Sequence, residues 1–188
     1  VQQWMDWEMD YLKYDWNPND VYHVKEMHDA LRSHNRDVVF SLSNSAPWGD
    51  AVQWEKMANC WRTTGDIRDT WERMSSLGFN QTKWAAYTGP GHWPDPDMLV
   101  VGMVGWGPKL HYTRLTPDEQ YTHITLWSIL AAPLLIGCDL EQMDDFTMNL
   151  LSNREVIAIN QDIAGIQGSR VYADNNKEIE VWSKPLKD

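Results

Sequence analysis

The stretch Asp10-Tyr11-Leu12-Lys13-Tyr14-Asp15-Trp16 decides both the fold and the chemistry of this chain. Its tyrosines are β-formers around a leucine, and a turn cluster over residues 17–20 follows, so the stretch predicts a short buried strand that ends in a loop. Lys13 and Asp15 are two residues apart, so their side chains point the same way from a strand. A carboxylate at the end of a strand, beside a lysine that favours its charged form, is a candidate nucleophile. An ordinary ion pair at a strand end is the alternative, and the heptapeptide alone does not exclude it.

Composition limits the class of protein. The 188 residues are long enough for one domain, and 43% apolar and 23% charged residues are typical of a globular chain. The formal net charge of −11 argues against nucleic acid and anionic membrane as partners. No apolar run approaches the length of a transmembrane helix, no signal peptide is recognised, and no compartment is assigned. Cys60 and Cys138 lie in apolar surroundings, which predicts buried free thiols rather than a disulfide framework.

Strand patterns and helix patterns alternate along most of the chain. Strands are expected over residues 10–16, 37–43, 60–65, 98–100 and 133–138, and helices over 20–33, 51–57, 69–77, 117–132 and 141–151. Gly78 is expected to cap its helix at the carboxyl end, and residues 102–116 are expected to form a loop. Repeated strand–helix units predict parallel strands in an α/β fold.

The positions of the charged residues favour one α/β architecture. They follow several strands directly, which favours a TIM-type (β/α)8 barrel, and no glycine-rich phosphate motif follows any strand. Five strands do not close such a barrel, so residues 1–166 are predicted to form part of one; the resemblance described below implies that this part is the C-terminal portion. From Ser169 the pattern changes to alternation around Asp174-Asn175-Asn176, which predicts a β-hairpin. Residues 167–188 are therefore assigned to the start of a second, antiparallel domain.

Five motifs occur in order along the chain: Tyr11-Leu12-Lys13-Tyr14-Asp15, Trp61-Arg62-Thr63-Thr64-Gly65-Asp66-Ile67, Gly89-Pro90-Gly91-His92-Trp93 with Asp95-Pro96-Asp97-Met98-Leu99, Ala132-Pro133-Leu134-Leu135-Ile136-Gly137-Cys138-Asp139, and Ile157-Ala158-Ile159-Asn160-Gln161-Asp162. Together they resemble glycoside hydrolase family 27, the α-galactosidase (melibiase) family. The resemblance implies a (β/α)8 barrel followed by a β-sandwich, of which this chain covers about the fourth to eighth βα units and the first sandwich strands. The implied activity is retaining, exo-acting hydrolysis of terminal α-D-galactosides.

The resemblance also implies the catalytic residues. Asp15 is the implied nucleophile and Asp66 the implied general acid/base. Retention requires two carboxyl groups about 5–5.5 Å apart, and the ends of strands two apart in a barrel face the same mouth. Asp15 is expected to stay ionised beside Lys13. Asp66 is expected to be partly desolvated and to hold the proton that the leaving oxygen needs.

Further positions match sugar contacts of the family. By the resemblance, Lys13, Arg62 and Asp97 hydrogen-bond the sugar of an α-galactoside oligosaccharide or glycoconjugate, and no metal or cofactor is implied. Trp48 either stacks on the substrate or fills the core. Asn44 is the candidate for the contact at C2, because Ser43-Asn44-Ser45 stands where the family often has Cys-Glu-Trp. Glu8 stands where a glycine is usual.

Other functions stay open at this point. The family's remaining sugar contacts come from early strands, so a non-catalytic sugar-binding or inert barrel fragment is the alternative from another class. The same chemistry on N-acetyl-α-galactosaminides or β-L-arabinopyranosides is a second alternative, because these sugars share the hydroxyl layout. A partial barrel has open edges, so the isolated chain is expected to be poorly stable and nearly inactive. Its oligomeric state is not predicted.

Overall fold

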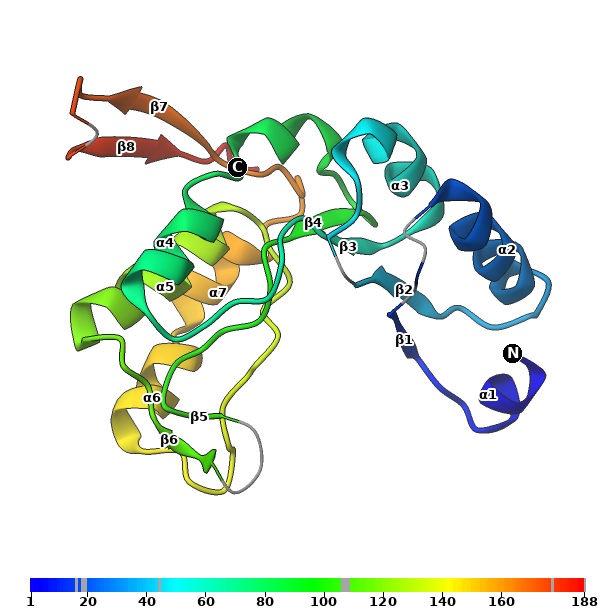
Figure 1. Ribbon diagram of the computed structural model, residues 1–188, viewed down its shortest axis with the longest axis horizontal. Helices are drawn as coiled ribbons and strands as arrows, with labels where there is room; N and C mark the ends of the chain where they lie inside the picture. Colours follow the sequence, from blue (N-terminus) through cyan, green and yellow to red (C-terminus); the bar gives the residue numbers. More distant parts are fainter. Residues whose placement is uncertain (16, 18–19, 44, 106–108, 177, 188) are drawn as a thin grey trace.

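A parallel sheet of four strands is the centre of the fold (Figure 1). The computed structural model describes residues 1–15, 17, 20–43, 45–105, 109–176 and 178–187. In chain order its elements are α1 (Gln2–Asp6), β1 (Tyr11–Tyr14), α2 (Val21–Arg32), β2 (Val39–Leu42), the 3-10 helix η1 (Trp48–Asp50), α3 (Ala51–Met57), β3 (Cys60–Arg62), α4 (Trp71–Gly78), the 3-10 helix η2 (Thr82–Tyr87), β4 (Trp93–Asp95), β5 (Met103–Val104), β6 (His111–Tyr112), α5 (Pro117–Ile129), α6 (Asp145–Leu151), α7 (Arg154–Asn160), β7 (Ser169–Ala173) and β8 (Glu180–Ser183). None of the helices in these ranges is long and apolar enough to cross a bilayer.

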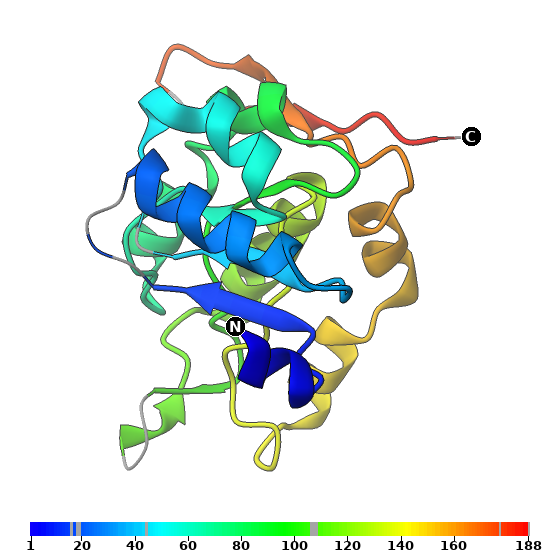
Figure 2. The same ribbon diagram turned by 90° about the vertical axis from the view of Figure 1, so that its right-hand side faces the viewer.

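The sheet has the order β1-β2-β3-β4 with every pair parallel, as the alternation of strand and helix patterns predicts. Helices α2 and α3 pack on one of its faces (Figures 1 and 2). The core between them is made of strand residues from that face and helix residues, among them Phe40, Leu42, Trp61, Val24, Leu31 and Trp54. Because side chains alternate along a strand, the residues between these apolar ones point to the opposite face.

Strand β4 is not where the sequence predicts it. The expected strand at 98–100 lies three residues past the end of β4, and within 98–100 only Leu99 pairs, in one parallel bridge to Ile136. That bridge is also the only pairing of the expected strand 133–138 within the described part of the chain. A proline at the centre of β4 and the glycines before it argue against a strand from sequence alone. Residues 93–95 form a strand because they pair with β3, with Trp93 opposite Cys60 and Asp95 opposite Arg62.

Gly78 does not cap α4, contrary to the prediction. It is the last residue of the helix, and the cap is Phe79 with a helical φ of −72°. A Cβ atom at Gly78 would lie 2.5 Å from Leu126 Cδ2 and 2.7 Å from Trp127 Cζ3 of α5. The glycine therefore serves the close approach of α4 to α5 rather than a turn.

Two other stretches hold more structure than the sequence predicts. Residues 102–116, expected as loop, contain the antiparallel pair β5–β6. The apolar residues 156–159 lie in α7, whose start is capped by the Asn153 side chain, which accepts hydrogen bonds from the N–H groups of Glu155 and Val156.

The predicted hairpin is present as β7 and β8, joined across residues 174–179. It projects beyond the helical layer in Figure 1. It contacts the rest of the chain through Trp182, whose ring centroid lies 6.0 Å from that of Phe79. Just before the hairpin, the Gly168 N–H donates to the Ile129 carbonyl at 2.8 Å. Its assignment to a separate domain from residue 167 stays a prediction.

Lys184 ties the end of the hairpin to two helices. Its Nζ donates to the carbonyls of Ser128 at 3.1 Å and Asn160 at 3.5 Å, which lie at the carboxyl ends of α5 and α7. Burial lowers the pKa of Lys184 to about 8, against the opposing effect of Asp162.

We expect this lysine to make stability depend on pH. Unfolded Lys184 keeps its proton up to about pH 10.5 and the folded one only up to about pH 8, so in between the unfolded state binds more protons. The free energy of unfolding should then rise with pH from 8 to 10.5 relative to Lys184→Met. Urea unfolding of both proteins at pH 7.5 and 10 measures this. A wild-type advantage that stays constant or shrinks over this interval contradicts it.

Glu8 has a strained backbone, with φ of 58°. Arg36 Nη2 donates to its carbonyl at 2.8 Å, which holds this conformation. Since a side chain is disfavoured in the left-handed region and glycine is not, Glu8→Gly should raise the free energy of unfolding by about 0.5–1 kcal/mol. Urea unfolding midpoints check this, with Glu8→Ala as the control that removes the carboxylate and keeps the Cβ. A glycine variant no more stable than the alanine variant would contradict backbone strain at this position.

Candidate active site

The sheet face turned away from α2 and α3 is polar toward the carboxyl ends of the strands. Strand register places Lys13, Ser41, Cys60 and Trp93 at one level of this face, and Arg62 and Asp95 at the next level. Asp15 follows β1 directly, two residues after Lys13. A parallel sheet gathers such side chains at one edge, which is where barrel enzymes place their active sites.

Arg62 is the centre of this cluster. It is buried, and its Nη2 lies 2.7 Å from Asp97 Oδ2 and 3.4 Å from Asp66 Oδ1. The same nitrogen donates to the Thr64 carbonyl at 3.1 Å. Its Nε is buried without a hydrogen-bond partner among the described residues. Arg62 thus contacts two other residues that the sequence singles out, Asp66 and Asp97.

Asp97 holds the segment that bears Asp66. Its φ of 101° is outside the range that side chains favour, and such strain is often found at functional sites. Its carboxylate accepts hydrogen bonds of 2.8 Å from the N–H groups of Ile67 and Met98. Its carbonyl accepts the Trp127 indole N–H at 2.6 Å. Because Ile67 is the neighbour of Asp66, the Asp97 carboxylate fixes the backbone beside the candidate acid.

Asp95 is a site residue that the sequence does not single out. It is 1% exposed, and its Oδ1 accepts the Asp97 N–H at 2.8 Å. Burial raises the pKa of Asp95 to about 6, against the hydrogen bond from Asp97 and the charges of Arg62 and Lys13. The spacing of two between Asp95 and Asp97 is the signal that could have found it, since it puts both on one face of an extended segment.

The two candidate catalytic acids lie beyond the carboxyl ends of β1 and β3, with β2 between them. Neighbouring strands are about 4.8 Å apart, so the backbones of β1 and β3 are separated by about 10 Å. The two carboxyl groups can lie closer together than this if both side chains point inward. Asp15 is exposed, and the Asp66 side chain is 91% exposed. The expected partial desolvation of Asp66 is therefore wrong for this chain, because the described residues leave most of its side chain exposed.

Trp48 does not join the cluster. The Trp48 ring packs edge-on against Trp84 at 4.7 Å and Tyr87 at 5.4 Å, and Lys83 Nζ lies 5.0 Å from its centroid. These partners belong to η2, on the helical side of the sheet. Asn44 lies outside the described residues.

A network of hydrogen bonds around Asp69, which the sequence does not predict, lies next to Asp66. The Asp69 carboxylate accepts hydrogen bonds from the Arg114 main chain at 3.0 Å, from Arg114 Nη2 at 2.5 Å and from His111 Nε2 at 3.0 Å. Burial alone would raise the pKa of Asp69, but these donors outweigh it and hold the pKa well below its usual range. The network joins the segment after β3 to β6 and to the residues before α5. Its members are 42 to 45 residues apart, so no local pattern announces it.

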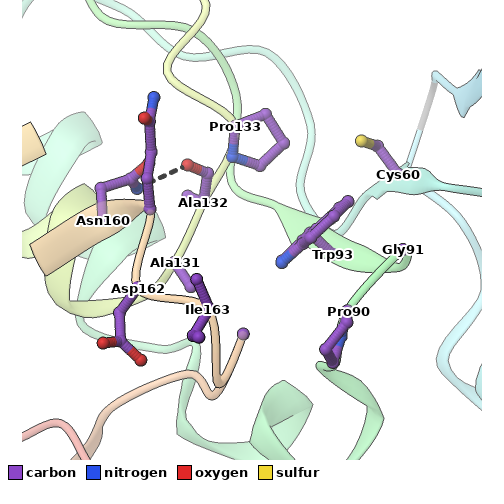
Figure 3. A pocket seen from close by; sticks show the side chains of 12 residues that line it. Cys60, Pro90, Gly91, Trp93, Ala131, Ala132, Pro133, Asn160, Asp162 and Ile163 are labelled. Atoms are coloured by element: carbon purple, nitrogen blue, oxygen red, sulfur yellow. Dashed lines mark hydrogen bonds between the residues drawn. The ribbon is translucent and has the colours of Figure 1, made fainter. Parts of the chain in front are cut away.

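A hollow of about 410 Å³ lies at the opposite, amino ends of the strands (Figure 3). Cys60 and Trp93, the first residues of β3 and β4, face Asn160, Asp162 and Ile163 across it. Burial raises the pKa of the Cys60 thiol to about 12, with Asp95 adding to the effect, and a raised pKa disfavours the reactive thiolate. In barrels this end contributes to stability and the other end to catalysis.

We expect Arg62→Met to destabilise the protein by about 3–5 kcal/mol, because it leaves the buried carboxylate of Asp97 without its cation and removes one of the two positive charges that act on Asp95. Urea unfolding measures the loss. The matched control is Arg32→Met, which removes a 52% exposed arginine paired with a fully exposed aspartate and should change stability by less than about 0.5 kcal/mol. Equal losses in the two variants would contradict a central role for Arg62.

Comparisons with known proteins show the family and the fold of this chain. A family model described as alpha galactosidase A (Melibiase_2) matches residues 1–162. The alpha-galactosidase of Cyamopsis tetragonoloba is 46% identical over 187 residues, which are 97% of this chain and 43% of that protein. The alpha-N-acetylgalactosaminidase of Gallus gallus is 34% identical over 200 residues, 99% of this chain and 47% of that protein. The solved structure of a GH27 β-L-arabinopyranosidase from Geobacillus stearothermophilus matches with a TM-score of 0.88 and 35% identity over 96% of this chain and 43% of that one. The chain spans less than half the length of each of these proteins.

Proposed function

The chain belongs to the alpha galactosidase A (melibiase) family, its sheet is part of that family's (β/α)8 barrel, and we propose that it contains both catalytic acids of a retaining exo-α-galactosidase. Asp15 is the nucleophile and Asp66 the general acid/base. The activity belongs to a longer protein that completes the barrel, since the relatives are more than twice as long as the part that this chain matches.

The observation that best supports this proposal is the contact of Arg62 with both Asp66 and Asp97 at the carboxyl edge of the sheet. In the first step Asp15 attacks the anomeric carbon from the β face while Asp66 gives its proton to the glycosidic oxygen. In the second step Asp66 takes a proton from water, which attacks the same carbon and releases Asp15. Two inversions leave the released galactose in the α configuration.

We propose that the hydroxyl groups of the galactosyl ring form hydrogen bonds with Lys13, Arg62 and Asp97. Charged donors and acceptors discriminate between epimers because a misplaced hydroxyl leaves a buried charge unpaired. Asp95 supports this set by accepting the Asp97 N–H beside the charges of Lys13 and Arg62. Asn44 remains a proposal for the contact at C2. Trp48 remains a proposal for stacking, and its packing on Trp84 and Tyr87 gives that role no support.

The test is turnover by the longer protein of three nitrophenyl glycosides: α-D-galactoside, N-acetyl-α-D-galactosaminide and β-L-arabinopyranoside. We expect the α-galactoside to have the highest kcat/KM. A preference for either of the other sugars would keep the chemistry and change the specificity, as the names of two relatives illustrate. No turnover of any of them would refute the proposal.

We further propose that the isolated 188-residue chain is poorly stable and nearly inactive. Among the described residues, the edge strand β1 pairs with a strand on one side only, and Asp66 is exposed to water. Assay of the chain on the aryl α-galactoside tests this, and turnover near that of the longer protein would overturn it. Galactose binding by the longer protein without any turnover would favour the sugar-binding alternative.

A further inference from the structure

A cationic hollow lies beside Asp66, on the side away from β1. It has a volume of about 710 Å³, and its lining consists of Asp66, Arg68, Thr70, Glu72, Arg73, Ser76 and Arg114. We call it the arginine hollow. Three arginines face two acids there, in a chain whose formal net charge is −11. The hydroxyl recognition proposed above uses none of these arginines.

A second hollow of about 270 Å³ adjoins the arginine hollow, because Arg68 and Arg114 line both. It adds the cationic or titratable side chains of Lys109 and His111 and the carboxylate of Asp69. The rest of its wall is largely apolar, with Met98, Val100 and Val104. The lining of the two hollows thus continues from Asp66 to Lys109 and to His111 of β6.

The charges in these hollows are not equally available to a ligand. The Asp69 carboxylate is occupied by Arg114 and His111, so this ion pair is close to neutral. Arg73 Nε donates to the Asp66 carbonyl at 2.8 Å, which holds its guanidinium beside the candidate acid. Arg68 is exposed, and its side chain makes no ion pair or hydrogen bond with the described residues. Two acids, Glu72 and Asp66, remain to oppose Arg68 and Arg73 in the arginine hollow, and the Asp66 carboxylate also lies 3.4 Å from Arg62 Nη2.

The position of a general acid defines where the leaving group lies. Asp66 must reach the glycosidic oxygen, so the aglycone passes the Asp66 carboxyl as it leaves and lies on that side of the site. The arginine hollow is lined by Asp66 itself, which places it on the aglycone's path. A guanidinium forms paired hydrogen bonds with a carboxylate, and charge-assisted bonds of this kind are stronger than those to a hydroxyl.

We propose that the arginine hollow is an aglycone subsite for α-galactosides whose aglycone bears a carboxylate, such as an aldonate or a uronate. Arg68 is its principal charge partner and Arg73 a second one. The proposal rests on the proposed function, since it assigns a substrate class to the same site.

The experiment compares two substrates of the longer protein, α-galactosyl-(1→6)-gluconate and α-galactosyl-(1→6)-glucitol. They differ in a carboxylate against a CH2OH group far from the scissile bond, so their leaving oxygens are nearly equivalent. At low ionic strength we expect kcat/KM to favour the gluconate by about 3- to 10-fold, and 1 M salt to bring the ratio close to one. Arg68→Gln should lower the ratio at least about twofold and Arg68→Glu should bring it to one or below. Arg32→Gln, a variant on the distant helix α2, should leave the ratio as in the wild type.

The outcomes separate the two proposals. A wild-type ratio of one or less, or a ratio that Arg68→Gln does not change, overturns the subsite while turnover of the glucitol compound keeps the galactosidase. Absence of turnover for both compounds and for the aryl α-galactoside refutes the proposed function, and the subsite with it. The salt dependence in the wild type tests the subsite without any substitution.

Discussion

Replacing Asp15 with glycine will lower kcat/KM on aryl α-galactosides by on the order of 10⁴-fold or more, because the covalent intermediate can no longer form. Azide should restore part of the turnover. The missing side chain leaves room on the β face of the sugar, where a small anion can attack the anomeric carbon in place of the carboxylate. The product is then β-galactosyl azide, which NMR identifies from its anomeric coupling.

The control for this variant is Asp37→Gly, which removes a fully exposed carboxylate after α2 and should leave kcat/KM within about twofold of the wild type. An α-galactosyl azide from the Asp15→Gly protein would assign the acid/base role to Asp15 and reverse the two roles. Activity near that of the wild type would remove Asp15 from the mechanism.

Replacing Asp66 with alanine should have an effect that depends on the leaving group. General acid catalysis is worth about 10²–10⁴-fold, so disaccharides, whose leaving oxygens need a proton, should lose that much in kcat/KM. Dinitrophenyl galactosides need no proton to leave and should lose far less. The basic limb of the pH–rate profile should disappear with the acid. Steady-state kinetics on both substrate classes measures the contrast.

The same variant tests the second half of the reaction. Without Asp66 no base activates water, so the galactosyl-enzyme accumulates on the dinitrophenyl substrate and azide should intercept it from the α face. α-Galactosyl azide is therefore expected here, the opposite anomer from the Asp15 variant. A loss of equal size for both leaving-group classes would show that Asp66 acts on binding rather than on proton transfer.

Much of the barrel portion can be predicted from sequence because its local signals agree with its tertiary pairing. The first three strands are short apolar runs that end in polar loops, and α2 has both an Asp20 cap and an apolar stripe. In strand β4 the local signal and the tertiary pairing disagree. Pro94 disfavours a strand locally, and the strand forms because it pairs with β3. The predicted helix cap at Gly78 is wrong for a related reason: the glycine is needed for contact with α5, which lies about 50 residues away in the sequence.

Part of the candidate site can likewise be predicted from sequence, and part of it depends on the tertiary structure. Arg62, Asp66 and Asp97 stand in contiguous motifs, and the structure brings them into contact. The bonds from Asp69 to Arg114 and His111 cross more than 40 residues and depend on how β6 and α5 are placed, which no periodicity encodes. The exposure of Asp66 also differs from the expectation, because burial depends on surrounding segments that the motif itself does not supply.

The central claim is that Asp15 and Asp66 serve one anomeric carbon with Asp15 as the nucleophile. The most direct measurement is mass spectrometry of the longer protein after inactivation by an activated 2-deoxy-2,2-difluoro-α-galactoside, whose fluorines slow hydrolysis of the trapped intermediate. The account predicts a stoichiometric sugar adduct on the peptide that contains Asp15, lost in the Asp15→Gly variant. An adduct on Asp66 or on any other residue would contradict it.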